Sequence, residues 1–167
     1  LHEPSKEEVR RFTPGSPLHR EAFAVIYDWA GDRTSEAVVD LAQRKVTAWK
    51  DVPGAQPPLI PAERALVPKL VKADPRWQEA MRKRGITDFS LCMVDPWSAG
   101  NFGLDDEKGR RLSRALTWVR ARPDDNGYAR PVENVITVVD LQAMQVLAVE
   151  DYGVVPLTPE DANYSPQ

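Results

Sequence analysis

Few side chains in this sequence could carry nucleophilic or metal chemistry. The chain contains one cysteine, Cys92, and two histidines, His2 and His19. Catalytic Ser-His-Asp and Cys-His sites need an ordered histidine as the base, but His2 stands beside the first residue and His19 lies in the polar stretch 17–20. Cys92 falls within the apolar run 91–94, a pattern typical of a buried structural thiol. We therefore expect no hydrolase chemistry, no catalytic residue and no metal site in this chain.

Charged residues gather in three places, and none has the pattern of a ligand site. The acidic clusters 105–107 and 124–125 lack the alternating ligand spacing of a calcium loop. The basic residues between 108 and 122 alternate mostly with Leu, Ala and Val rather than with aromatics that stack on bases. The net charge is -3, and no apolar run approaches the about 18 residues of a membrane span. We therefore expect neither a nucleic-acid partner nor a membrane partner.

Aromatic residues near prolines are the strongest candidates for a binding surface. Trp97 follows Pro96 in the stretch 95–103, and Tyr128 lies in the stretch 126–131. Aromatic side chains on loops mark many binding surfaces. The alternative is that these rings only cover the end of a sheet, and the residue pattern alone leaves both interpretations open.

The first element predicted along the chain is an antiparallel meander. Alternating apolar residues predict a strand over 22–29, followed by strands over 36–41 and 45–49. The stretch 52–58 contains prolines and a glycine, which end a strand and favour turns. It therefore predicts a linker between two parts of the chain.

Two helices are predicted after this linker. Apolar residues at i, i+4 spacing predict the first, which either begins at Pro68 or is kinked there. The second has Asp74 as its N-cap, Pro75 at its first position and Gly85 after a basic last turn. These signals define both ends of the second helix.

Strand signals return in the last part of the chain. Strands are predicted over 90–94, 134–141 and 145–150, with a polar loop at 103–107. The segment 111–121 alternates like a strand, but its length also suits a helix.

The two hairpins resemble each other at an offset of one hundred residues. Residues 37–41 are Ala-Val-Val-Asp-Leu and residues 137–141 are Thr-Val-Val-Asp-Leu. The resemblance favours a duplicated unit, although chance similarity is the alternative. The fold class is then α+β, with two tandem domains that each pack a helix on one face of an antiparallel sheet. We assign residues 1–56 to a first domain without its N-terminal helix and most of its first strand, and residues 57–167 to the second.

Motifs spread along the chain resemble the N-terminal region of copper- and topaquinone-dependent primary amine oxidases. They are Asp-Pro-Arg-Trp at 74–77, Arg-Gly-Ile-Thr-Asp at 84–88, Val-Asp-Pro-Trp-Ser-Ala-Gly-Asn-Phe-Gly at 94–103 and Asp-Tyr-Gly-Val-Val-Pro at 151–156. The bacterial tyramine, phenethylamine and histamine oxidases are the members that the chain resembles. The resemblance implies two cystatin-like α+β domains ahead of a large β-sandwich catalytic domain, and it implies a strand at 111–121.

The resemblance also implies the chemistry of the parent polypeptide, which is oxidation of primary amines to aldehydes with release of ammonia and hydrogen peroxide. The copper and the topaquinone of the family are implied to lie in the catalytic domain, so this chain is expected to hold neither and to be inactive alone. Asn163 and Tyr164 imitate the family's Asn-Tyr-Asp/Glu cofactor motif, but Ser165 stands in place of the acid. The implied partners are the catalytic domain of the same polypeptide, a second subunit in a homodimer and a primary amine. The fragment itself is expected to be a monomer.

Three positions of the family's amine channel carry over to this chain. Pro96 and Trp97 match positions in the wall at the channel mouth, and Tyr128 matches a gate-like position that often holds Trp. A further wall position, usually aromatic, corresponds to Arg64 and departs from the pattern. The resemblance therefore implies that Pro96, Trp97 and Tyr128 line the substrate entrance of the full enzyme.

A free-standing cystatin-like binding module or inhibitor is the competing interpretation. The inhibitory Gln-x-Val-x-Gly loop is absent, and the nearest stretch, 145–149, lies inside a predicted strand. The lone cysteine favours a cytoplasmic location, although some members of the family are exported.

Overall fold

The computed structural model describes residues 1–100 and 102–159, and the chain divides into two compact units. The first unit is Leu1–Pro57, with α1 (Lys6–Arg11), β1 (Glu21–Asp28), β2 (Arg33–Asp40) and β3 (Lys45–Asp51). The second unit begins at Pro58 and contains α2 (Pro61–Ala73), α3 (Pro75–Lys83), a 3₁₀ turn (Phe89–Leu91), β4 (Cys92–Ser98), β5 (Leu112–Val119), β6 (Val135–Asp140) and β7 (Gln145–Asp151). The described helices include none that is long and apolar enough to cross a membrane.

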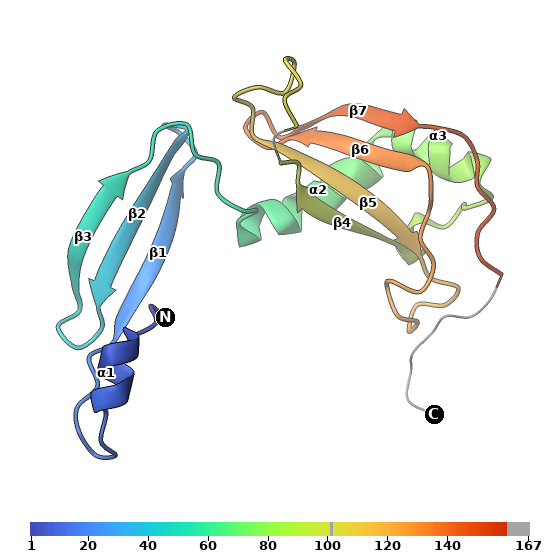
Figure 1. Cartoon of the computed structure of the whole chain (residues 1–167). Helices are drawn as coiled ribbons and strands as arrows, with labels where there is room; N and C mark the ends of the chain where they lie inside the picture. The colour runs from blue at the N-terminus through green and yellow to red at the C-terminus, as the bar shows by residue number, and fades with distance from the viewer. Residues whose placement is uncertain (101, 160–167) are drawn as a thin grey trace. The chain divides into compact units, whose positions relative to one another are not determined.

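The first unit is the predicted three-stranded antiparallel meander, in the order β1-β2-β3 (Figure 1). The short helix α1 was not predicted. It begins with a capping box, in which Ser5 Oγ accepts from the Glu8 amide and the Glu8 carboxylate accepts from the Ser5 amide. None of the residues of α1 is buried, so this helix adds nothing to a core.

Both faces of the sheet in the first unit leave large apolar side chains exposed. Phe23 and Val25 on one face are each 46% exposed, and Trp49 on the other face is 56% exposed. Ala37 is the only buried apolar residue of residues 1–57, all of which the structure describes. Burial of apolar surface therefore stabilises this sheet very little.

We expect the two units to differ strongly in hydrogen exchange. Amides of β5 and β6 should be protected at least about 100-fold more than amides of β1–β3, because local stability follows buried apolar contacts. Exchange measured by mass spectrometry on chain 1–167 tests this expectation. Equal protection of the two sheets would contradict it.

The second unit packs two helices on one face of a four-stranded antiparallel sheet with the order β4-β5-β6-β7 (Figure 1). The core lies between the layers and contains Val67, Val71, Trp77 and Met81 from the helices against Val139 and other strand residues. Trp77 is fully buried, and its Nε1 donates to Thr117 Oγ1 at 3.1 Å. The α+β architecture predicted from the sequence is confirmed.

The helices follow their sequence signals. Pro68 lies inside α2, so the helix neither begins nor ends at this residue. Asp74 caps α3 by accepting from the amide of Arg76 at 2.8 Å. At the other end Gly85 has a φ of 77°, and the Ile86 amide donates to the Met81 carbonyl at 3.0 Å. This is a Schellman motif, which requires the left-handed conformation that glycine adopts without strain.

Strand β4 extends further than predicted. It ends at Ser98 rather than at 94, so Pro96 and Trp97 lie in a strand and not on a loop. Proline is tolerated because β4 is an edge strand. The Ala99 amide donates to the Leu112 carbonyl, at the start of the adjacent strand β5. Because backbone amides alternate in direction along a strand, the nitrogen of Pro96 points away from β5, toward the open edge. No hydrogen bond between the strands is therefore lost at this proline. Leu112–Val119, within the segment 111–121, forms strand β5, as the resemblance implied.

The two hairpins that resemble each other in sequence also match in structure. Val38/Val39 and Val138/Val139 mark a bulge at the same place in both hairpins. Asp40 Oδ1 accepts from the backbone amides of residues 42 and 43, both at 2.8 Å. Asp140 Oδ1 likewise accepts from the amides of residues 142 and 143, at 2.9 and 2.8 Å. The two hairpins share only part of their residues, yet they have the same turn, the same strand register and a bulge at the same position.

Candidate functional site

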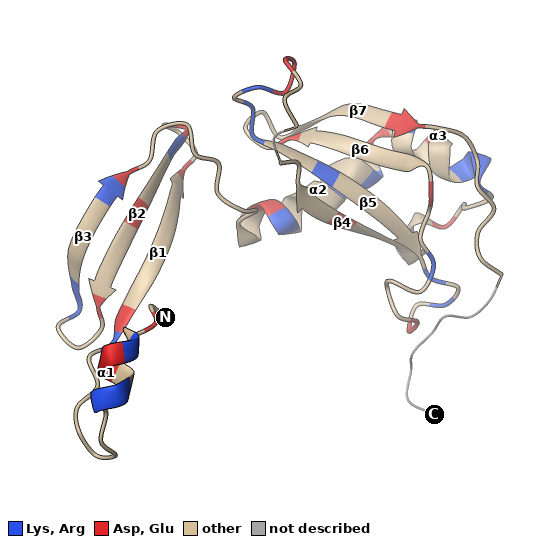
Figure 2. Ribbon diagram, viewed as in Figure 1, with Lys and Arg blue, Asp and Glu red and all other residues tan. Residues whose placement is uncertain are grey.

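The basic segment of the second unit does not form a free cationic surface. Arg110 pairs with Asp140 at 2.8 Å, and Arg114 pairs with Glu107 at 2.5 Å. Arg111 is buried against Glu63. Figure 2 shows positive and negative residues together along the loops that join the strands. These three arginine charges are therefore balanced by carboxylates of the second unit.

The acidic and histidine residues do not form a metal centre. In residues 1–100 and 102–159, no group of three or more His, Cys, Asp or Glu side chains could hold a metal ion. His2 and His19 each lie 3.3 Å from the carboxylate of Glu21. Asp125 is buried and accepts from the amides of residues 121 and 122, so it closes a loop rather than facing solvent. The described side chains do not fit a copper site.

Asn163, Tyr164 and Ser165, which imitate the family's cofactor motif, lie outside the described residues.

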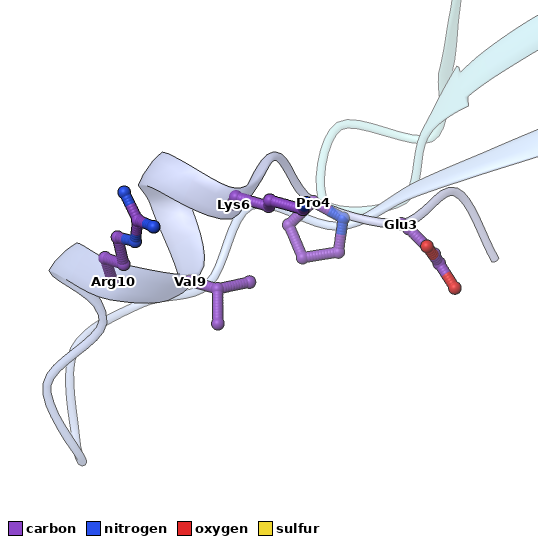
Figure 3. Close-up of a pocket in the computed structure, with 5 residues that line it drawn as sticks. All are labelled: Glu3, Pro4, Lys6, Val9 and Arg10. Atoms are coloured by element: carbon purple, nitrogen blue, oxygen red, sulfur yellow. The ribbon is translucent and has the colours of Figure 1, made fainter.

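A surface hollow beside α1 is no better candidate. Its lining residues are Glu3, Pro4, Lys6, Val9 and Arg10 (Figure 3). All five are exposed, and they come from one short helix and the segment before it. The hollow therefore has no buried polar group that could orient a ligand.

The strongest candidate site is a pair of exposed aromatic rings held by one carboxylate. Trp97 is 58% exposed and Tyr128 is 56% exposed. Trp97 Nε1 donates to Asp95 Oδ2 at 3.1 Å, and the Tyr128 hydroxyl donates to the same oxygen at 3.1 Å. These bonds link strand β4 to a loop more than thirty residues later in the chain and fix the polar ends of both rings.

Strand alternation explains which residues take part. Successive side chains of β4 point to opposite faces. Cys92, Val94 and Pro96 are buried, whereas Asp95 is half-buried and Trp97 is exposed on the other face. The structure thus brings Trp97 and Tyr128 together and leaves Pro96 on the opposite side of the strand.

The loop that carries Tyr128 is packed closely on the sheet. A Cβ atom on Gly127 would lie 2.5 Å from Met93 Sδ, so a larger residue here would have to displace the Met93 side chain. The Tyr128 ring meets the Trp118 ring edge to face, with 5.2 Å between the centroids. Asn126 Oδ1 accepts from the Tyr128 amide at 3.0 Å. The backbone, the hydroxyl and one edge of this tyrosine are therefore each fixed by a contact, while more than half of the residue stays exposed.

Asp95 controls the chemistry of Tyr128. The hydrogen bond from the Tyr128 hydroxyl to Asp95 and the negative charge of Asp95 raise the pKa of Tyr128 above its ordinary value. The positive charge of Arg64 acts in the opposite direction. Arg64, which the resemblance matches to a usually aromatic wall position, is exposed on α2. Its charge therefore acts on the aromatic site.

Sequence reasoning missed the two residues that organise this site, Asp95 and Trp118. Asp95 and Trp97 are spaced by two residues, which places both on one face of a strand. That signal was present, but the expectation of a loop at 95–103 concealed it. Trp118 could be placed only after the ambiguous segment 111–121 was known to be a strand.

The site is built for binding rather than for covalent catalysis. Its described residues offer a carboxylate, two ring faces and a nearby guanidinium, and they include no nucleophile paired with a base. Cys92 is buried, and desolvation raises the pKa of its thiol to about 11, as a structural cysteine requires. The stretch 145–149, the nearest match to an inhibitory cystatin loop, lies within β7 and pairs with β6.

Comparison with known proteins shows matches along both units. The family model described as the copper amine oxidase N2 domain matches residues 1–52, and the one described as the copper amine oxidase N3 domain matches residues 62–166. The boundary between the two matches falls in the same stretch as the boundary between the compact units.

Individual relatives agree with the family models. The chain is 43% identical to a primary amine oxidase of Arthrobacter sp. (strain P1), over 100% of this chain and 25% of that protein. It is 39% identical to N-methylputrescine oxidase 1, peroxisomal, of Nicotiana tabacum, over 85% of this chain and 20% of that protein. The chain thus spans about a quarter or less of the length of these relatives.

A solved structure matches the fold. A copper-containing benzylamine oxidase from Hansenula polymorpha aligns with a TM-score of 0.63 and 19% identity, over 98% of this chain and 28% of that one. The similarity extends through both units.

Proposed function

The chain belongs to the copper amine oxidase family as its N-terminal N2 and N3 domains, and from this premise we propose that its second unit forms part of the amine channel entrance. The complete polypeptide would oxidise primary amines to aldehydes, ammonia and hydrogen peroxide. The copper and topaquinone for that reaction would belong to its catalytic domain, and the enzyme would work as a homodimer. Residues 1–167 would contribute binding surface and no reacting group.

One observation carries this proposal: the rings of Trp97 and Tyr128 are exposed to solvent and held in a fixed orientation. Exposed tryptophan and tyrosine side chains normally sample several rotamers, and ordering them on binding has an entropic cost. Hydrogen bonds to Asp95 and the contact with Trp118 set this orientation in advance. A preorganised aromatic surface is what a channel needs in order to sort amines by the shape of their apolar part.

The three channel positions would then have different tasks. Trp97 and Tyr128 would supply ring surface to the passing amine. Pro96 would act through the backbone, because it is buried on the opposite face of β4 and fixes the strand on which Trp97 stands.

Replacement of Trp97 by alanine in a full-length enzyme tests the proposal. We expect KM for bulky primary amines to change at least about fivefold, with a smaller change for short alkylamines, because the lost ring would contact mainly the apolar part of the substrate. Steady-state kinetics over an amine series measures this selectivity.

Trp49 provides a matched control. It is exposed to a similar degree, 56%, and its Nε1 also donates to an aspartate two residues away, Asp51, at 3.1 Å. Trp49→Ala should leave the amine series unchanged. Unaltered KM and selectivity in Trp97→Ala would refute the channel role.

A further inference from the structure

We propose that Asp95, together with the rings of Trp97 and Tyr128, is a capture site for the protonated amino group of the incoming amine. This inference rests on the proposed channel role, and it adds that the negative charge of Asp95 takes part in binding the amine. The rings would receive the apolar part of the substrate, and the carboxylate would hold the ammonium group before the amine moves further along the channel.

The charge of Asp95 is not neutralised by direct contact with a cationic side chain among the described residues. Among residues 1–100 and 102–159, it takes part in no ion pair. By contrast, Glu107 and Asp125 in the neighbouring loops pair with Arg114 and Arg122. Asp95 is half-buried, where an unpaired carboxylate favours a cation more than one in bulk water does.

The hydrogen bonds of Asp95 leave room for a ligand. Both donors, the Trp97 indole and the Tyr128 hydroxyl, are neutral, and both go to Oδ2. They orient the carboxylate without cancelling its charge. A carboxylate has about four lone-pair sites, so further acceptor capacity remains for the N–H groups of an ammonium ion.

The flanking aromatic rings also attract the ammonium group. The faces of Trp and Tyr rings attract cations, and the effect is strongest for Trp. A primary amine is almost fully protonated at neutral pH, because alkylammonium groups such as that of lysine have a pKa near about 10.4. A carboxylate flanked by two aromatic rings therefore matches both ends of a primary amine, its ammonium group and its apolar tail.

Arg64 on α2 carries a charge opposite to that of Asp95, and this charge acts on Tyr128. Its positive charge already acts on Tyr128 and would repel an approaching ammonium ion. Removal of the two charges should thus have opposite effects. Asp95→Asn should weaken capture, and Arg64→Ala should strengthen it.

Kinetics of the full-length enzyme with benzylamine test the proposal. Asp95→Asn keeps an oxygen that can accept from Trp97 and Tyr128, so it removes the charge and preserves the frame. We expect KM to rise about five- to tenfold with kcat nearly unchanged, and the salt dependence of kcat/KM to become weaker. Arg64→Ala should lower KM. Asp124→Asn, which neutralises an exposed carboxylate in the loop that carries Tyr128, is the matched control and should change neither constant.

Titration of chain 1–167 gives a readout that does not need the oxidase reaction. Benzylammonium chloride should shift the indole N–H resonance of Trp97, whereas benzyl alcohol, which has the same ring and no charge, should shift it far less. Asp95→Asn should remove the difference between the two probes. Equal shifts with both probes in the unchanged chain would overturn the proposal.

The outcomes separate this inference from the proposed function. If Trp97→Ala alters amine selectivity while Asp95→Asn behaves like Asp124→Asn, the channel role holds and the capture role fails. If Asp95→Asn and Trp97→Ala lower the melting temperature of the enzyme and leave KM unchanged, the rings serve as packing between domains, and both proposals fail.

Discussion

Replacing Glu63 by glutamine should lower the free energy of unfolding of the second unit by about 3–5 kcal/mol. The Glu63 side chain is fully buried and the Arg111 side chain is 3% exposed. The two join through a pair of bonds, Arg111 Nε to Glu63 Oε1 and Arg111 Nη2 to Glu63 Oε2, each at 2.7 Å. Glu63 Oε2 also accepts from the Ile60 amide at 2.9 Å, at the start of α2. The neutral glutamine would leave a buried guanidinium without its counter-charge.

Chemical denaturation followed by tryptophan fluorescence measures this loss. Glu79→Gln is the control within the same unit, because Glu79 and Arg82 form an exposed pair at 3.8 Å that should contribute less than about 1 kcal/mol. Replacing both buried partners, as Glu63→Leu with Arg111→Met, should recover much of the stability, since no isolated charge then remains. A Glu63→Gln protein within about 1 kcal/mol of the original would show that the pair is not needed.

Cys92 should react with iodoacetamide at least about 100-fold more slowly in the folded chain than in denaturant at pH 8. Burial raises the pKa of its thiol from 9.0 to about 11, so the thiolate fraction at pH 8 falls about 100-fold, and the side chain is only 1% exposed. Mass spectrometry of the alkylated chain over time gives the rate, and the denatured chain is the control. Fast modification under native conditions would contradict the buried position of Cys92.

The raised pKa of the Cys92 thiol also makes the stability of the second unit depend on pH. Because the folded-state pKa is raised, the neutral thiol contributes stability that is fully present below about pH 9 and is lost as the pH rises toward about 11. Cys92 is the only cysteine and lies in the core of the second unit, so its alkylation reports the opening of that unit alone. Glu63→Gln should accelerate the reaction wherever opening limits it.

Local signals predicted much of the fold correctly. The capped helix α3 and the duplicated hairpins depend on interactions within a few residues, such as the Asp74 cap and the Gly85 turn, which single sequence motifs specify. The motifs at 74–77 and 94–103 carried the family resemblance that the comparisons confirm.

Features that depend on distant residues could not be predicted in the same way. The length of β4 depends on its position at the sheet edge, which makes Pro96 harmless, and no local pattern shows which strand is at the edge. The link from Asp95 to Tyr128 spans 33 residues, and the pair Glu63–Arg111 spans 48. Their partners become neighbours only through the packing of the sheet, the loops and α2.

The most direct test of the channel role is the position of a bound amine relative to the aromatic pair. We expect a crystal structure of the full-length enzyme, with a long-tailed amine inhibitor in its channel, to place the tail within about 4 Å of the Trp97 and Tyr128 rings. If another part of the enzyme covers both rings and the tail passes elsewhere, the second unit does not form the entrance.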